Sequence, residues 1–133
     1  MPGFPGPMEG SIFWEDEDIY ACLAFHPITK GHTVVVWRKN VGDLNQLQLD
    51  DFLCLMRVVF EVRHALMIFY KTDKVYLYYL DEAMHVHIHL VPRKKGGKEG
   101  PKLLAQPHRK LEDLSSIPHL RHLCDRLLSQ GGL

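Results

Sequence analysis

Three histidines alternate with aliphatic residues in the stretch HVHIHLVPR, which spans residues 85–93. The histidines are His85, His87 and His89, and the intervening residues are Val86, Ile88 and Leu90. Successive side chains of a β-strand point to opposite faces, so this spacing predicts a strand with imidazoles on one face and aliphatic side chains on the other. Such a strand is typical of the floor of a functional site.

Three interpretations of the imidazole face are open. A sheet surface that carries the rings by chance gains little stability from them. A metal site suits imidazole ligands, but three ligands on one straight strand fan out along it, and two of them would need a distant third such as His32. Catalysis is favoured, because imidazole acts as a nucleophile, a general acid or base, or a donor to an oxyanion. No metal site is therefore predicted.

Several short segments are expected to form the sheet around this strand. The stretch IFWEDEDIYACLAF has a polar turn at residues 15–18 between two apolar segments, which is typical of a β-hairpin. Residues 33–37 are β-branched and apolar, so they predict a buried strand. Residues 73–80 also have the composition of a strand.

Two helices and one loop complete the expected elements. Apolar residues recur every three or four positions from Asp51 to Tyr70, which predicts an amphipathic helix with Asp50 or Asp51 as its N-cap. Residues 93–102 are basic and rich in glycine and predict a mobile loop, and residues 118–128 predict a short helix. Together the elements indicate an α+β fold with an antiparallel sheet that is covered on one face.

Composition limits the class of protein. The 133 residues suit one domain with a hydrophobic core, and residues 1–10, rich in proline and glycine, are expected to form a flexible leader. Sixteen basic residues balance sixteen acidic ones, so no nucleic-acid or membrane partner is expected. The three cysteines form no CxxC pair, and we expect a reduced, cytoplasmic setting without a signal peptide or a membrane helix.

The stretch HVHIHLVPR resembles the signature of the histidine triad (HIT) superfamily, nearest its fragile-histidine-triad and bacterial HIT hydrolase branches. The stretch FWEDEDIYACLAFHPITKGHTVVVWRKN is similar to the segment that precedes the triad in that family, so the resemblance covers roughly Phe13 to Arg93. It implies one HIT-like domain over residues 11–133, with a sheet of about five strands, one long helix and a C-terminal helix. It also implies a homodimer.

The same resemblance implies a nucleotide hydrolase or nucleotidyl transferase that acts on a small-molecule nucleotide, such as a nucleoside polyphosphate or an AMP conjugate. By motif position, His87 would attack the α-phosphorus and form a covalent nucleotidyl-histidine. His85 and His89 would hold its ring and contact phosphate oxygens, and His32 would support the cluster. No cofactor is required for this chemistry, although a divalent cation can accompany the phosphates of the substrate.

Substrate-binding candidates are less distinctive. Leu23, Phe25 and Val34 are candidates for a nucleobase pocket, with ordinary core packing as the alternative. Arg93 is a candidate for binding the phosphates of the leaving group, with solvated loop charge as the alternative.

The chain departs from the family pattern at three positions. Ala24 stands where the family often has Asp or Asn for the ribose hydroxyls, and a methyl group makes no such bond. Asp81 and Glu82 stand where the family has Gln and Ser or Thr, and a carboxylate turned inward would repel a phosphate, so we expect both to face solvent or serve the backbone. These positions leave open a catalytically weak nucleotide-binding or regulatory module.

Overall fold

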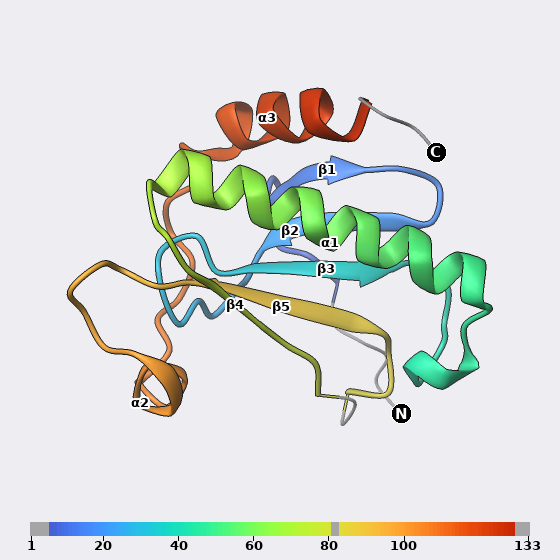
Figure 1. Cartoon of the computed structure of the whole chain (residues 1–133), viewed down its shortest axis with the longest axis horizontal. Coiled ribbons are helices and arrows are strands. Elements are labelled where there is room, and N and C mark those ends of the chain that lie inside the picture. The colour runs from blue at the N-terminus through green and yellow to red at the C-terminus, as the bar shows by residue number, and fades with distance from the viewer. Residues whose placement is uncertain (1–5, 81–82, 130–133) are drawn as a thin grey trace.

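The computed structural model describes residues 6–80 and 83–129 of the chain. Within them, five strands form one antiparallel sheet in the order β1-β2-β3-β5-β4 (Figure 1). The strands are β1 (Ile12–Glu15), β2 (Ile19–Leu23), β3 (Thr33–Trp37), β4 (Val75–Tyr78) and β5 (His87–Pro92). The helices are the 3-10 helix η1 (Leu44–Gln46) and the α-helices α1 (Leu49–Tyr70), α2 (Gly100–Leu104) and α3 (Ile117–Ser129). This arrangement confirms the predicted α+β fold and its sheet of about five strands.

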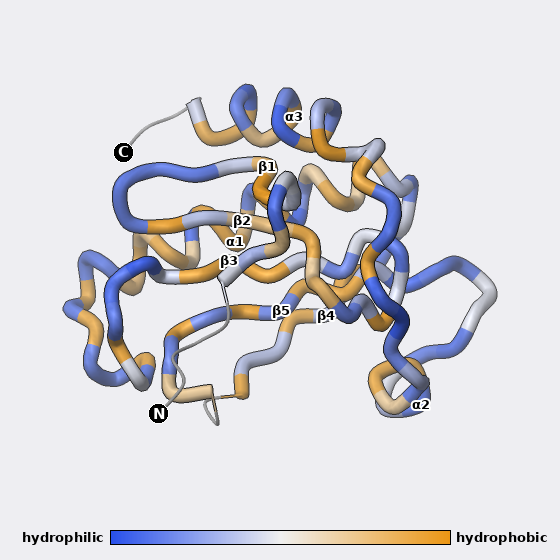
Figure 2. The backbone as a smooth tube through the Cα atoms, turned by 180° about the vertical axis from the view of Figure 1, so that it is seen from behind, coloured by the Kyte–Doolittle hydropathy of each residue, from blue (hydrophilic) through white to orange (hydrophobic). Residues whose placement is uncertain are grey.

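The two faces of the sheet have different roles. Ile19, Ala21 and Leu23 of β2 belong to the main hydrophobic core, whereas Tyr20 and Cys22 belong to a smaller apolar cluster on the opposite face. Helices α1 and α3 pack against each other and against the core side of the sheet (Figure 1). Neither helix covers the other side, which faces the viewer in Figure 2. We call this second side the open face.

Helix α1 confirms the predicted amphipathic helix, but its predicted N-cap is wrong. The helix begins at Leu49 after Gln48, whose side chain makes no capping hydrogen bond. Asp50 and Asp51 lie inside the first turn, where their charges interact favourably with the positive end of the helix dipole. The helix ends at Tyr70, and the following Lys71 is a left-handed C-cap whose N–H donates to the carbonyl of Met67.

The predicted mobile loop over residues 93–102 is wrong at its end, where α2 forms. Proline in the first turn favours helix initiation there. Leu103 is buried in a cluster with Ile28 and Val91, so α2 packs on the open face at the far end of β5. This long-range packing outweighs the glycine-rich composition of the segment. The predicted C-terminal helix is confirmed by α3.

Two expectations fall partly or wholly outside the described residues. Asp81 and Glu82 are among the undescribed residues, as are residues 1–5 of the expected leader. Residues 6–10 are described, and Met8 packs against the main core while its carbonyl accepts the N–H of Ser11. Among the described helices, none combines the length and the apolar composition needed to span a bilayer.

Candidate active site

His87 and His89 lie side by side on the open face. The register of the sheet pairs Val36 with His87 and Val34 with His89, and the two imidazole centroids are 5.0 Å apart. Val86, Ile88 and Leu90 are buried in the main core on the other side, as the alternating pattern predicts.

His85 is the exception, and the prediction that all three histidines share one strand is wrong for it. Strand β5 begins only at His87. Just ahead of it, Met84 has a left-handed backbone, and the N–H of Val86 donates to the carbonyl of Val41, outside β3. The ring of His85 therefore turns toward β3, where its Nε2 lies 2.6 Å from the carbonyl oxygen of Trp37.

A chain of hydrogen bonds fixes the tautomers of His32 and His89. The backbone N–H of Ile28 donates to Nδ1 of His32 at 2.9 Å, so that nitrogen must carry a lone pair. A neutral His32 then holds its proton on Nε2, which lies 2.9 Å from Nδ1 of His89. When His32 donates to that atom, the remaining proton of a neutral His89 sits on its own Nε2. His89 is thereby prepared to donate a hydrogen bond to a ligand.

His87 receives the opposite tautomer. Its Nδ1 lies 2.6 Å from the backbone carbonyl oxygen of His85, and because a carbonyl only accepts, Nδ1 must donate. The lone pair of a neutral His87 is then on Nε2, which is the form of imidazole that attacks an electrophile. His85 therefore contributes to this arrangement through its backbone oxygen.

Burial keeps these rings uncharged. The pKa of His32 is lowered to about 3, mainly because burial disfavours the charged ring, and also because His89 and His108 lie near it. The pKa of His89 is lowered to about 4 by burial and then by the proximity of His87 and His108. The pKa of His87 is lowered too, chiefly by burial, although its bond to the His85 carbonyl favours the charged form. At neutral pH the ring of His87 is therefore uncharged.

A cavity of about 410 Å³ opens over these histidines. This volume is in the range of small-molecule sites in proteins. Its apolar part comes from the open face, namely Tyr20, Cys22, Ala24, Val34 and Val36. Tyr78 of the neighbouring strand stacks on His89, with the ring planes 8° apart and the centroids 4.4 Å apart. An apolar floor that ends in imidazoles suits a ligand with one flat apolar end and one anionic end.

The substrate-binding candidates from the sequence lie in different places. Val34 and the half-exposed Phe25 line the cavity. Leu23 borders it as well, but its side chain is buried in the main core beneath the sheet. Arg93 does not line it, and its guanidinium lies 3.3 Å from Asp73 and 3.1 Å from Glu99.

Several lining residues were not identified from the sequence. Tyr20 and Cys22 follow the period-two pattern of β2 and could have been found by extending it. The segment Gly6–Met8, His26 and His108 also line the cavity, and no local pattern marks them. Across residues 6–80 and 83–129, no cluster of three or more His, Cys, Asp or Glu side chains has an arrangement suited to a metal ion.

Two comparisons with known protein sequences give matches. The HIT domain family model matches residues 7–96. An uncharacterized HIT-like protein of Methanocaldococcus jannaschii is 28% identical over 102 residues, which cover 71% of this chain and 77% of that protein.

Solved structures show the same fold. A hypothetical histidine triad nucleotide-binding protein from Sulfolobus tokodaii has a TM-score of 0.68 at 23% identity, covering 92% of this chain and 85% of the other. A diadenosine triphosphate hydrolase from Plasmodium falciparum has a TM-score of 0.56 at 19% identity, covering 96% and 80%. With a family model that spans most of the sequence, the chain belongs to the HIT domain family.

Proposed function

We propose that the protein is a nucleotide hydrolase or nucleotidyl transferase that cleaves at the α-phosphate of a nucleoside polyphosphate or an AMP conjugate. The observation that carries the proposal is the hydrogen bond from Nδ1 of His87 to the His85 carbonyl, which places the lone pair of a buried ring on Nε2. Family membership supports a nucleotide as the ligand class.

In the first step, Nε2 of His87 forms a bond to the α-phosphorus while the bond from phosphorus to the leaving group breaks. The departing group takes the electron pair of that bond. The charge on His87 is stabilised by the carbonyl that accepts its Nδ1–H, and the N–H of His89 donates to a phosphate oxygen. His32 acts through His89, because its own Nε2 is bonded to that ring.

In the second step, water bonds to the same phosphorus and gives a proton to solvent. The bond from phosphorus to Nε2 breaks, its electron pair returns to the ring, and the nucleoside monophosphate is released. The protein groups supply the charge stabilisation, and a divalent cation can enter with the substrate phosphates. We place the nucleobase against the apolar floor, with Phe25 and Val34 at its boundary.

The second candidate function is a nucleotide-binding or regulatory module with weak turnover. Ala24 favours it, because its methyl group lies in the apolar cluster of the open face and makes no hydrogen bond to a ribose. The intact histidine cluster favours the enzyme.

Incubation with an AMP conjugate labelled in the nucleotide separates the two functions. We expect a covalent labelled adduct with the wild-type protein, none with His87→Asn, and an unchanged amount with His122→Ala, whose ring is exposed on α3. Mass spectrometry of the quenched protein measures it. Tight AMP binding without adduct or turnover would instead establish the module.

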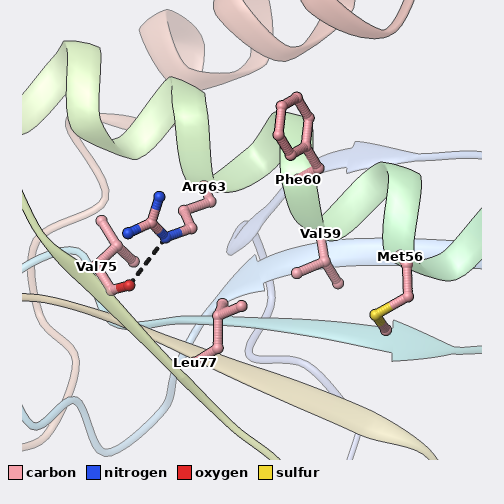
Figure 3. A pocket seen from close by; sticks show the side chains of 6 residues that line it. All are labelled: Met56, Val59, Phe60, Arg63, Val75 and Leu77. Atoms are coloured by element: carbon pink, nitrogen blue, oxygen red, sulfur yellow. Dashed lines mark hydrogen bonds between the residues drawn. The ribbon is translucent and has the colours of Figure 1, made fainter.

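We further propose that a second copy of this chain binds at the edge of the sheet. Strand β4 is an edge strand, and between it and α1 lies an apolar groove lined by Met56, Val59, Phe60, Arg63, Val75 and Leu77 (Figure 3). Phe60 and Leu77 are 69% and 50% exposed and line the same groove, and a contiguous exposed apolar patch is typical of a protein–protein interface. A strand with one open edge beside an exposed apolar groove can be buried by a second copy.

Sedimentation velocity tests the homodimer. We expect a dimer of the wild-type chain that dissociates in Phe60→Asp. Ile68→Asp is the matched control, because Ile68 is also exposed on α1 but does not line the groove. A monomeric wild-type protein at micromolar concentration would contradict the proposal.

A further inference from the structure

His108 reaches the active-site cavity from a part of the chain far from the histidine triad. The chain between α2 and α3 returns along one side of the sheet (Figure 2). On the way it lies against the loop after β2, where the N–H of Arg109 donates to Pro27 at 3.2 Å and that of Leu111 donates to Phe25 at 2.7 Å. These two bonds hold the segment that carries His108 beside the cavity.

Side-chain contacts anchor this segment on both sides of His108. The side chain of Gln106 donates to the carbonyl of Ile28, and Leu111 is buried in the main core. His108 itself is exposed, yet it lines the cavity. An exposed ring between two fixed points is well placed to contact a ligand without contributing to the packing of the fold.

The direction of attack decides which part of a substrate His108 meets. His32 and His87 are only 2% and 5% exposed, so the attacking nitrogen lies at the bottom of the cavity. In phosphoryl transfer the attacking and leaving atoms lie roughly in line through phosphorus. The leaving group therefore departs away from the floor and toward the opening of the cavity. We call this opening, where the exposed His108 lines the cavity, the rim.

The rim is also suited to negative charge. No Asp or Glu occurs among the described residues that line the cavity, whereas His26 and His108 both do. Lys110 extends over the ring of Phe25, with its Nζ 5.8 Å from the ring centroid, so it adds a cation beside the same opening. His108 also contributes to lowering the pKa of both His32 and His89.

We infer that His108 is a specificity-determining residue that donates a hydrogen bond to the leaving group and favours leaving groups that carry phosphate. The inference rests on the proposed orientation of a nucleotide in this cavity. It assigns substrate recognition to the segment between α2 and α3, which lies outside the region matched by the family model.

Binding of two nucleotides that differ on the leaving side tests it. Isothermal titration compares AMP with α,β-methylene-ATP, whose bond after the α-phosphate is not cleaved, in the wild-type protein and in His108→Ala. A lost charge-assisted hydrogen bond predicts an affinity for α,β-methylene-ATP about tenfold lower, with the affinity for AMP within about twofold. His108→Gln keeps an N–H donor and should recover part of the loss.

His122→Ala serves as the matched control, since it removes an exposed histidine away from the cavity and should change neither affinity. An equal loss for both nucleotides, or no loss for either, would overturn the inference. If the wild-type protein binds both but turns over no AMP conjugate, the hydrolase proposal fails while a selective loss in His108→Ala still supports the inference. A wild-type protein that binds neither nucleotide overturns both.

Discussion

Acid should destabilise the protein through His32, because the folded state resists protonation of that ring. Its pKa is lowered to about 3 in the folded state, whereas an unfolded histidine titrates at about 6.5. Between these values the unfolded chain binds a proton that the folded chain does not, so stability is fully present above pH 6.5 and is lost as the pH falls toward 3.

The magnitude follows from the same two values. Between about pH 6.5 and pH 4.5 the unfolded ring is protonated and the folded ring is not. Each of these about two pH units lowers the free energy of unfolding by about 1.36 kcal/mol, so His32 should account for a loss of about 2–3 kcal/mol between pH 7 and pH 4.5. His32→Asn isolates this contribution, since the side-chain oxygen of asparagine can still accept from the Ile28 N–H but the side chain does not titrate. His87 and His89 remain in both proteins.

Urea unfolding followed by the fluorescence of Trp14 and Trp37 measures the effect. We expect His32→Asn to be less stable than wild type at pH 7, and this difference to become smaller by about 2–3 kcal/mol at pH 4.5. His122→Ala serves as a control for the removal of an exposed histidine. If the His32→Asn difference is the same at both pH values, protonation of His32 carries no penalty in the folded state, and the reasoning from its burial is wrong.

Two further predictions concern the packing around the site. Gly31→Ala should destabilise the protein by about 3 kcal/mol in urea unfolding, because it adds a clash to a left-handed backbone: its φ is +89° and the new Cβ would lie 2.5 Å from the ring of Tyr70. Gly96→Ala, with a φ of +79° and nothing within 4 Å, should cost only about 1 kcal/mol, so equal losses would exclude the clash. The second prediction concerns the thiols, whose labelling by a maleimide is measured by mass spectrometry. We expect the reagent to label only the exposed Cys54 in the folded protein and all three cysteines in urea, because Cys22 and Cys124 are buried with their pKa raised to about 12. Rapid labelling of Cys22 in the folded protein would show that the cavity floor opens.

Local sequence patterns were sufficient for most elements. The alternation in β5 predicted which side chains enter the core, since a strand has a strict period of two. The period of α1 predicted the helix but not its cap, because two neighbouring aspartates offer the same chemistry and only the packing of the helix selects its first residue. The helix α2 was missed because Leu103 is stabilised by residues distant in sequence.

The sequence by itself determined that imidazoles alternate with aliphatic residues, and therefore that one face of a strand would carry them over a buried core. Only the tertiary structure decided which hydrogen-bond partners orient those rings. The bond between His32 and His89 joins residues 57 positions apart, and the turn ahead of β5 moves His85 out of the strand so that its carbonyl orients His87. His108 is brought to the rim by backbone bonds to the loop after β2. A local sequence pattern predicts which face of a strand a side chain occupies. The position of a proton on a ring, and the set of residues that line a pocket, depend on residues distant in sequence that folding brings together.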